Sequence, residues 1–224
     1  MPIFRTKNED FFKKWSPEMA YVLGFFAADG NMLKNRRGAH FMEFTSTDKD
    51  IIVKIRKALG SSHKISCRQT NPKWKPAYRI QIGSKVIFSD LLELGMTPAK
   101  SNVIKFPDIP NKYFGDFLRG YFDGDGGVYF GRYWRKDRKK WKWDLTTRFT
   151  SGSKIFLEGL LNKLRKNVSG GFIHKKKGGY DLVFSRAGSI DLYQILYYNS
   201  LSDLFLKRKL RTFQRAFKVL NLGT

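Results

Sequence analysis

The chain has 224 residues, with 43 Lys and Arg against 19 Asp and Glu, and a net charge of +24 at pH 7. A charge of this size indicates a polyanionic partner, with nucleic acid ahead of an anionic membrane. The hydrophobic content of 42% excludes a basic disordered tail, because it is enough for a real core.

Cys67 is the single cysteine, which excludes a disulfide framework and a cysteine-rich zinc site. We expect this thiol to be a small buried apolar residue. No segment is apolar over the length of a bilayer, and the N-terminal residues do not have the pattern of a signal peptide. These features predict an intracellular protein of the cytoplasm or an organelle, with no membrane partner.

The first elements in chain order are a short helix at 8–14 and a longer helix that begins at Ser16-Pro17-Glu18 and runs to about Ala28. A capping hydroxyl, a proline in the first turn and an early acid are typical of a helix start. Apolar periodicity and turn residues then predict strands at 30–36 and 39–46, a helix at 48–59, strands at 63–69 and 77–83, a helix at 84–94 and a proline-rich linker at 96–110.

The second half of the chain replays this order. Phe149-Thr150-Ser151 repeats Phe44-Thr45-Ser46, each just before a helix. A tandem duplication follows from this match, rather than two unrelated α/β pieces. The predicted elements are a helix at 111–124, strands at 126–134 and 141–150, a helix at 153–166, strands at 171–176 and 179–185, and helices at 188–198 and 204–219.

This order predicts an α+β fold with two pseudo-symmetric αββαββα halves, at 1–95 and 111–224. Each half would form an antiparallel four-stranded, saddle-shaped sheet with helices on one face.

Two stretches organise both halves: VLGFFAADG at 22–30 and LRGYFDGDG at 118–126. Each predicts an apolar helix with small residues four apart, ended by an acid and a glycine. Because residues i and i+4 share a helix face, we expect the two helices to pack on each other. Asp29 and Asp125 would then lie side by side at one end of the pair. The small residues are Gly24, Ala28, Gly120 and Gly124.

These two motifs resemble those of the single-chain LAGLIDADG homing endonucleases. The second copy is close to the family pattern, whereas Ala27 replaces the usual acid in the first. The resemblance implies site-specific double-strand cleavage of a long asymmetric DNA target, across the minor groove with short 3′ overhangs, by a protein of a mobile intron or intein. The sequence alone leaves the target, the host and the choice between intron and intein open.

The resemblance also implies the metal ligands, which are the Asp29 and Asp125 carboxylates with the backbone carbonyls of Ala28 and Gly124. Two divalent ions at a carboxylate pair can activate water, stabilise charge and assist the leaving group. Oxygen ligands and few protein ligands favour Mg²⁺. We expect two or three ions, and the sequence leaves open whether the two acids share one of them. The alternative is that both acids are helix-end turn residues.

Lys100 and Lys209 match the family's basic residues by repeat position. Each could hold a water or stabilise developing phosphate charge, or could simply attract phosphate. We interpret Asp123 as structural, because its counterpart is Ala27.

Ser46 and Ser151 stand where many relatives have a water-positioning glutamine, and their role stays open. The histidines lack metal-ligand spacing and are interpreted as core or DNA-contact residues: His40, His63 and His174.

Alternation along the strands leaves one basic sheet face open in each half. In strand 63–69, for example, Ile65 and Cys67 are predicted to point to the core. Arginine, lysine and amide side chains on a sheet can read bases in the major groove, although a merely solvated face is the alternative. The predicted DNA contacts are Asn31, Arg36, Arg37, Lys64, Ser66, Arg68, Lys73, Lys75, Arg79, Gln81, Tyr129, Tyr133, Arg135, Lys142, Thr146, Arg148 and Lys176.

Each half would cover about 30 Å of duplex, and both together about 18 base pairs. We therefore expect a monomer that binds double-stranded DNA and requires no protein partner. An intron RNA maturase and a non-cleaving DNA-binding protein on the same scaffold are the alternatives. The retained acids favour the nuclease, since binding alone does not need them.

Overall fold

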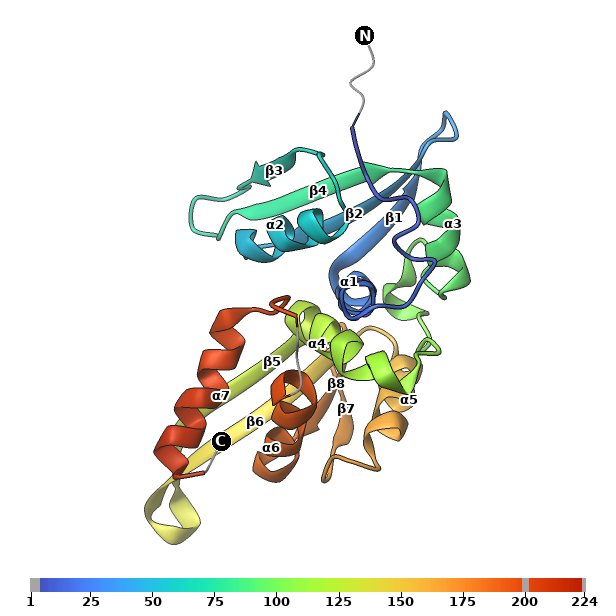
Figure 1. Cartoon of the computed structure of the whole chain (residues 1–224). Helices are drawn as coiled ribbons and strands as arrows, with labels where there is room; N and C mark the ends of the chain where they lie inside the picture. Colours follow the sequence, from blue (N-terminus) through green and yellow to red (C-terminus); the bar gives the residue numbers. More distant parts are fainter. Residues whose placement is uncertain (1–4, 199–201, 223–224) are drawn as a thin grey trace.

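The computed structural model describes residues 5–198 and 202–222, which form two antiparallel four-stranded sheets with a pair of helices between them (Figure 1). The strand orders are β1-β2-β4-β3 and β5-β6-β8-β7, so the second sheet repeats the topology of the first. The prediction of an α+β fold with two matching halves is confirmed.

In the first half, the Ser16 hydroxyl accepts a hydrogen bond from Met19 N at 3.1 Å and caps the first helix as predicted. The helix predicted at 8–14 is wrong, because this segment forms turns. There the Lys13 N–H donates to the Asp10 carbonyl oxygen at 3.1 Å, which is the i to i+3 contact of a turn and not the i to i+4 contact of an α-helix. The elements are α1 (Pro17–Asp29), β1 (Gly30–Lys34), β2 (His40–Ser46), α2 (Lys49–Ala58), β3 (Ile65–Arg68), β4 (Ala77–Gly83), α3 (Lys85–Glu93) and the 3₁₀ turn η1 (Lys100–Asn102).

The second half has a longer hairpin and one irregular helix. The segment predicted as a single helix at 188–198 starts earlier and ends in a π-helical turn. The elements are η2 (Asn111–Tyr113), α4 (Phe114–Asp125), β5 (Gly126–Arg135), η3 (Lys136–Arg138), β6 (Lys140–Ser151), α5 (Lys154–Leu164), β7 (Phe172–Lys176), β8 (Gly179–Phe184), α6 (Arg186–Tyr193), η4 (Gln194–Tyr198) and α7 (Lys207–Leu220).

Helices α1 and α4 pack with their backbones in contact. A Cβ atom added at Gly24 would lie 2.0 Å from the carbonyl oxygen of Phe117, and one at Gly120 would lie 2.0 Å from that of Tyr21. No side chain fits at such distances, so both motif glycines are required by the close approach. The predicted packing of the motif helices is confirmed.

Helices cover one face of each sheet, and the strands alternate between that face and the open face. In β6, Leu145, Thr147 and Phe149 are buried and Arg148 is exposed, as the alternation predicts. Cys67 corrects the prediction for β3: it is exposed. It faces the same side as the buried core, but β3 is a four-residue edge strand, so its cysteine remains uncovered.

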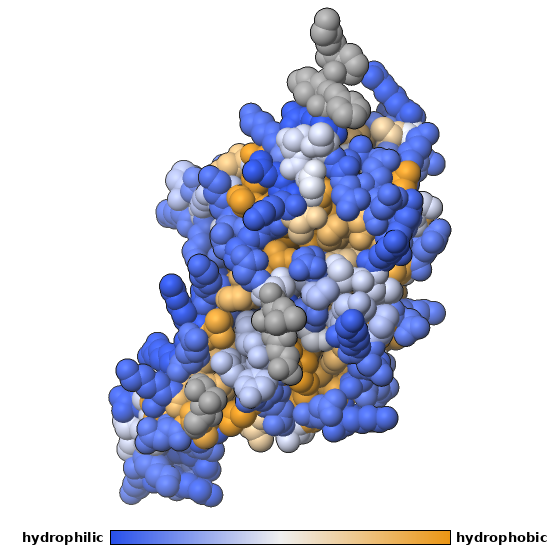
Figure 2. Space-filling model, viewed as in Figure 1, coloured by the Kyte–Doolittle hydropathy of each residue, from blue (hydrophilic) through white to orange (hydrophobic). Residues whose placement is uncertain are grey.

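Hydrophilic residues cover most of the surface in Figure 2, including the basic β5–β6 hairpin that projects at the lower left. No helix in the described part of the chain combines the length and apolar character needed to cross a membrane.

Candidate active site

Asp29 and Asp125 are the last residues of α1 and α4, so both carboxylates lie where the helix pair ends. The helices touch up to this point: a Cβ at Gly124 would lie 2.4 Å from the Ala28 methyl and 3.4 Å from Asp29 Oδ2. Asp29 is exposed and Asp125 is half-buried, and neither carboxylate accepts a hydrogen bond within residues 5–198 and 202–222. The structure thus brings the two predicted acids together, with their oxygens available.

The charge of this acid pair is costly in the protein alone. The pKa of Asp29 is raised to about 6, first because surrounding protein displaces water and then because Asp125 repels a second negative charge. Desolvation also raises the pKa of Asp125, against the opposing influence of Lys100 and Lys209. A cation between the two carboxylates would relieve this cost.

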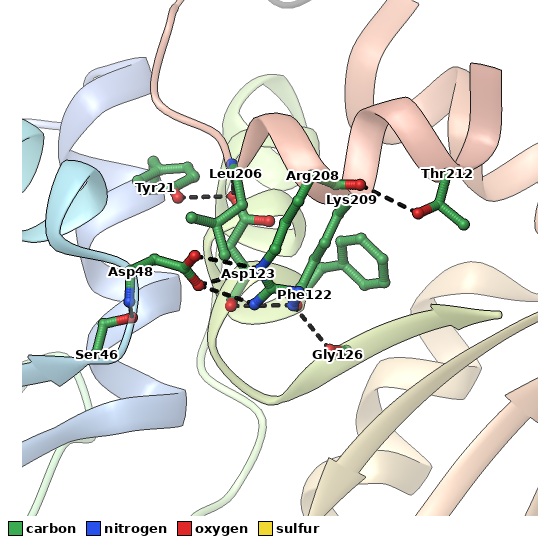
Figure 3. A network of polar contacts seen from close by, with 10 residues as sticks. All are labelled: Tyr21, Ser46, Asp48, Phe122, Asp123, Gly126, Leu206, Arg208, Lys209 and Thr212. Carbon is green, nitrogen blue, oxygen red and sulfur yellow. Dashed lines mark hydrogen bonds and ion pairs between the residues drawn. The ribbon is translucent and has the colours of Figure 1, made fainter. Parts of the chain in front are cut away.

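Two buried lysines reach the site through equivalent contacts. Lys100 Nζ donates to the carbonyl oxygen of Gly30, the residue after Asp29. Lys209 Nζ donates to the carbonyl oxygen of Gly126, the residue after Asp125, at 2.7 Å (Figure 3).

Each ammonium group also lies near the phenylalanine ring of its own motif, and burial is the first cause that lowers both lysine pKa values to about 8. The repeat match between Lys100 and Lys209 therefore corresponds to a match in space.

Residues 16–94 match the family model of the LAGLIDADG-like domain. The I-LtrWI LAGLIDADG homing endonuclease bound to target DNA superposes with a TM-score of 0.60 at 15% identity, over 96% of this chain and 92% of that one. Residues 16–94 form a LAGLIDADG-like domain, and the whole chain has the LAGLIDADG fold.

Other LAGLIDADG-fold structures agree. The homing endonuclease I-WcaI bound to its DNA recognition sequence has a TM-score of 0.60 at 17% identity, over 91% of this chain and 90% of that one. I-SmaMI bound to uncleaved DNA target in the presence of calcium ions has a TM-score of 0.58 at 15% identity, over 93% and 92%.

Two curated proteins of Methanocaldococcus jannaschii match in sequence. One is the uncharacterized protein MJ0398, 27% identical over 57% of this chain and 44% of the relative. The other is the DNA-directed RNA polymerase subunit Rpo1C, 28% identical over 64% of this chain and 15% of the relative. This chain therefore aligns with less than half the length of either curated relative.

Helix α4 carries a buried polar network that the sequence predicted only in part. Asp123 Oδ2 accepts hydrogen bonds from Tyr21 Oη at 2.8 Å and from Leu206 N at 2.9 Å (Figure 3). Arg119 is 1% exposed and donates to the carbonyl oxygens of Leu196 and Leu204. The network ties α7, and with it Lys209, to both motif helices. An arginine inside an apolar motif was the available signal for Arg119.

Ser46 and Ser151 have matching local roles. Each hydroxyl accepts the backbone N–H two residues later, at 3.1 Å, and so supports a turn before a helix. Ser46 also lines a hollow of about 260 Å³ beside Asp29, together with Asp48 and Arg208. Arg208 donates to Asp48 at 2.9 Å and links the two halves across this hollow (Figure 3).

None of the three histidines contacts Asp29 or Asp125 within the described residues. The His40 ring packs on Phe88, His63 bonds to Ser61, and His174 contacts Phe172. No group of three or more His, Cys, Asp or Glu residues forms a metal cluster among the residues described.

The two carboxylates nevertheless fit a hard divalent ion that takes most of its ligands from water and from a bound substrate. The protein offers two carboxylates without hydrogen-bond partners at one point, which suits Mg²⁺ because that ion keeps waters and binds substrate phosphates.

The predicted DNA contacts gather on the open sheet faces and the loops beside them. Arg79 and Gln81 of β4 are exposed on the first sheet, and Tyr129 and Arg148 on the second. Arg135 and Lys176 are engaged with acids, Asp137 and Asp181 respectively. The remaining exposed members of the predicted set are Asn31, Arg36, Arg37, Lys64, Ser66, Arg68, Lys73, Lys75, Tyr133 and Lys142, while Thr146 is half-buried.

Sequence reasoning missed Glu43 and Asp181 on these open faces, although alternation along the strand at 141–150 placed Asp144 there. Glu43 lies among the predicted contacts of the first sheet, and Asp144 and Asp181 lie among those of the second. Strand alternation could have placed Glu43 on the open face, but its partners depend on which residues lie opposite it.

Proposed function

We propose that this protein is a site-specific endonuclease that cuts both strands of a long, asymmetric DNA duplex with the aid of Mg²⁺. The observation that carries the proposal is the pairing of Asp29 and Asp125 at the touching ends of α1 and α4, with Lys100 and Lys209 on equivalent carbonyls beside them. Binding alone would need neither the acid pair nor two buried lysines.

The chemistry follows from these four side chains. Asp29 and Asp125 would hold the ions, which supply an activated water and charge stabilisation to phosphodiester hydrolysis. The carbonyls of Ala28 and Gly124 would add ligands. Lys100 and Lys209 would each orient a water or offset the charge that develops on the phosphate. Their lowered pKa values, about 8, leave them mostly protonated at neutral pH.

The two sheets would supply the DNA-binding surface. Their open faces and adjoining loops carry most of the predicted basic and amide contacts, and the net charge of +24 favours a polyanion. The I-LtrWI and I-WcaI structures of the same fold are bound to DNA. Because one chain provides both motif helices, we propose that the protein acts as a monomer. We also propose an intracellular location, since its DNA substrate lies inside cells.

A cleavage assay tests the proposal. The protein is incubated with a plasmid pool carrying randomised inserts, in Mg²⁺ or in EDTA, and the linearised products are sequenced. We expect cuts at one related set of long, non-palindromic sites in Mg²⁺ and none in EDTA.

Binding measurements on folded RNA and duplex DNA at several salt concentrations complete the test. Duplex affinity should fall with salt at a log–log slope steeper than about −5, because each phosphate contact contributes about −0.9. Sequence-selective binding without cutting in any divalent ion would favour a non-cleaving DNA-binding protein. Tighter binding to folded RNA than to duplex would favour the maturase.

A further inference from the structure

The open face of the first sheet contains one buried acid, and it lies among three predicted base-reading side chains. Glu43 faces away from the helix-covered core, because its neighbours Met42 and Phe44 point into that core. It is nevertheless only 7% exposed. A carboxylate on a surface that binds phosphates would repel the partner if it were free. Its contacts show that it is not free.

Glu43 holds side chains from both neighbouring strands. Its Oε1 accepts hydrogen bonds from Gln81 Nε2 at 2.8 Å and from Arg79 Nη1 at 3.1 Å, and its Oε2 accepts one from Asn31 Nδ2 at 3.4 Å. Asn31, Arg79 and Gln81 are themselves exposed. The acid therefore lies beneath them and limits the positions their polar groups can take.

This cluster lies at the cleavage end of the sheet. Asn31 follows Asp29 by two residues at the start of β1, and it pairs with Glu43, which in turn pairs with Gln81. The amide nitrogens of Asn31 and Gln81 donate to Glu43, and their side-chain oxygens accept no hydrogen bond among the described residues. Oriented amides and arginines are the groups that discriminate base edges in the major groove.

The second sheet has the opposite arrangement at the matching positions. Strand register places Arg148 where the first sheet has Glu43, and Asp181 where it has Arg79. Asp181 accepts one hydrogen bond from the Thr150 hydroxyl and pairs with Lys176 at 2.8 Å, whereas Arg148 makes no hydrogen bond within the described chain. The charges are exchanged, so the two halves cannot present the same pattern to DNA.

We propose that Glu43 is a positioning residue that sets the sequence specificity of one half-site, by holding Asn31, Arg79 and Gln81 in a fixed pattern toward a short block of bases beside the cleavage centre. The inference rests on the proposed function, since it assumes that this face binds duplex DNA. It assigns no contact between Glu43 and DNA. The second half-site would be read at the corresponding block by Arg148, which is less constrained.

Glu43→Gln tests this inference, because it keeps the shape and removes the charge that attracts Arg79. Asp144→Asn is the matched control: it makes the same change of charge on the open face of the other sheet, where Asp144 accepts one hydrogen bond from Thr146. Each protein, including the parent, selects from randomised duplexes in EDTA, and the bound sequences are compared position by position.

We expect Glu43→Gln to lose about 10-fold or more of the discrimination within one contiguous block of about two or three base pairs. Its affinity for random duplex should be unchanged or higher, since a negative charge is gone. Asp144→Asn should retain the parent's preference in that block. An unchanged profile, or an even loss of discrimination along the whole target, would overturn the inference, because a merely structural acid would not act on one block.

If Glu43→Gln does not fold, as judged by circular dichroism, Arg79→Lys takes its place, and it should relax the same kind of block while keeping the charge. The parent separates this inference from the proposed function. A parent that selects a sequence but does not cut in Mg²⁺ contradicts the endonuclease and leaves the role of Glu43 open to the same comparison. A parent that selects no sequence overturns both.

Discussion

The two halves of the molecule share their sheet topology and the close contacts at their common centre, and they differ in strand length and in buried polar residues. Gly24 and Gly120 make the same backbone contact, and the two lysines reach equivalent carbonyls. Away from the centre, β1 and β2 have 5 and 7 residues, whereas β5 and β6 have 10 and 12. The same close backbone contact constrains both halves at the centre. No such contact constrains the length of the described strands, so the two sheets can differ.

The motif helices themselves show the same contrast. Helix α4 carries Arg119 and Asp123, which bind the segment leading into α7, where α1 carries Leu23 and Ala27. The first half thus holds its lysine on η1 without a buried acid in its motif helix, and the second half uses one.

The largest expected effect is a loss of cleavage rate on substitution of either acid at the centre. Asp29→Asn and Asp125→Asn should both fold and bind DNA, and both should lose at least about 10³-fold in cleavage rate, because charge held for the transition state is removed. Nicked and linear plasmid are quantified against time. If a metal is shared, each variant loses both cuts; if the sites are separate, each becomes a nickase of opposite strand choice. Full double-strand cutting by both would remove these residues from the site.

Substitutions of Gly24 and Gly120 test whether α1 and α4 make the same close contact from both sides. Gly24→Ala and Gly120→Ala should each lower the free energy of unfolding by about 3 kcal/mol or more, because the new methyl meets a carbonyl oxygen at 2.0 Å. Both should also lose activity, since the helices and their acids separate. Urea unfolding measures the first effect.

Gly83→Ala is the control for the glycine pair, because its methyl would meet the Phe41 ring at 3.3 Å and the His40 carbonyl oxygen only at 3.8 Å. A Gly24→Ala or Gly120→Ala protein that unfolds like the parent would contradict the packing.

The buried acid tests the asymmetry between the motif helices. Asp123→Ala leaves the Tyr21 hydroxyl and the Leu206 N–H without their acceptor, and should cost about 2–3 kcal/mol of stability. Exchange of the Leu206 amide should accelerate more than that of amides in β4, because the loss is local to the attachment of α7. Uniform acceleration at both places would show that Asp123 does not hold this segment in particular.

The smallest effect is a difference in pH dependence. The folded-state pKa of Asp29 is raised to about 6 from an ordinary value of 3.8. The folded protein therefore binds more protons than the unfolded chain between these values, and the contribution of Asp29 to stability is lost as pH rises from about 4 to 6.

Melting temperatures of the metal-free parent and of Asp29→Asn across this range should reveal it: the stability of the parent relative to the variant should decline as pH rises. A constant difference would show that Asp29 keeps its ordinary pKa.

The sequence alone determined the fold class and the packing of the two motif helices. The repeated apolar helices, the glycines at i and i+4 spacing and the terminal acids are local features, and their geometric meaning does not depend on distant residues. The packing of Gly24 and Gly120 and the adjacency of Asp29 and Asp125 could therefore be predicted before any contact was known. Lys100 and Lys209 were implied by the family resemblance and located by the repeat.

Tertiary structure alone decided which polar groups meet. Glu43 is buried on an open face because Arg79 and Gln81 lie opposite it in the register, and Asp123 is anchored by Leu206, 83 residues away. Cys67 is exposed because its strand lies at the edge of a sheet. The burial and the hydrogen-bond partners of a residue depend on which distant residues lie beside it. Alternation along one strand predicts the face of the sheet on which a residue lies, but not these neighbours.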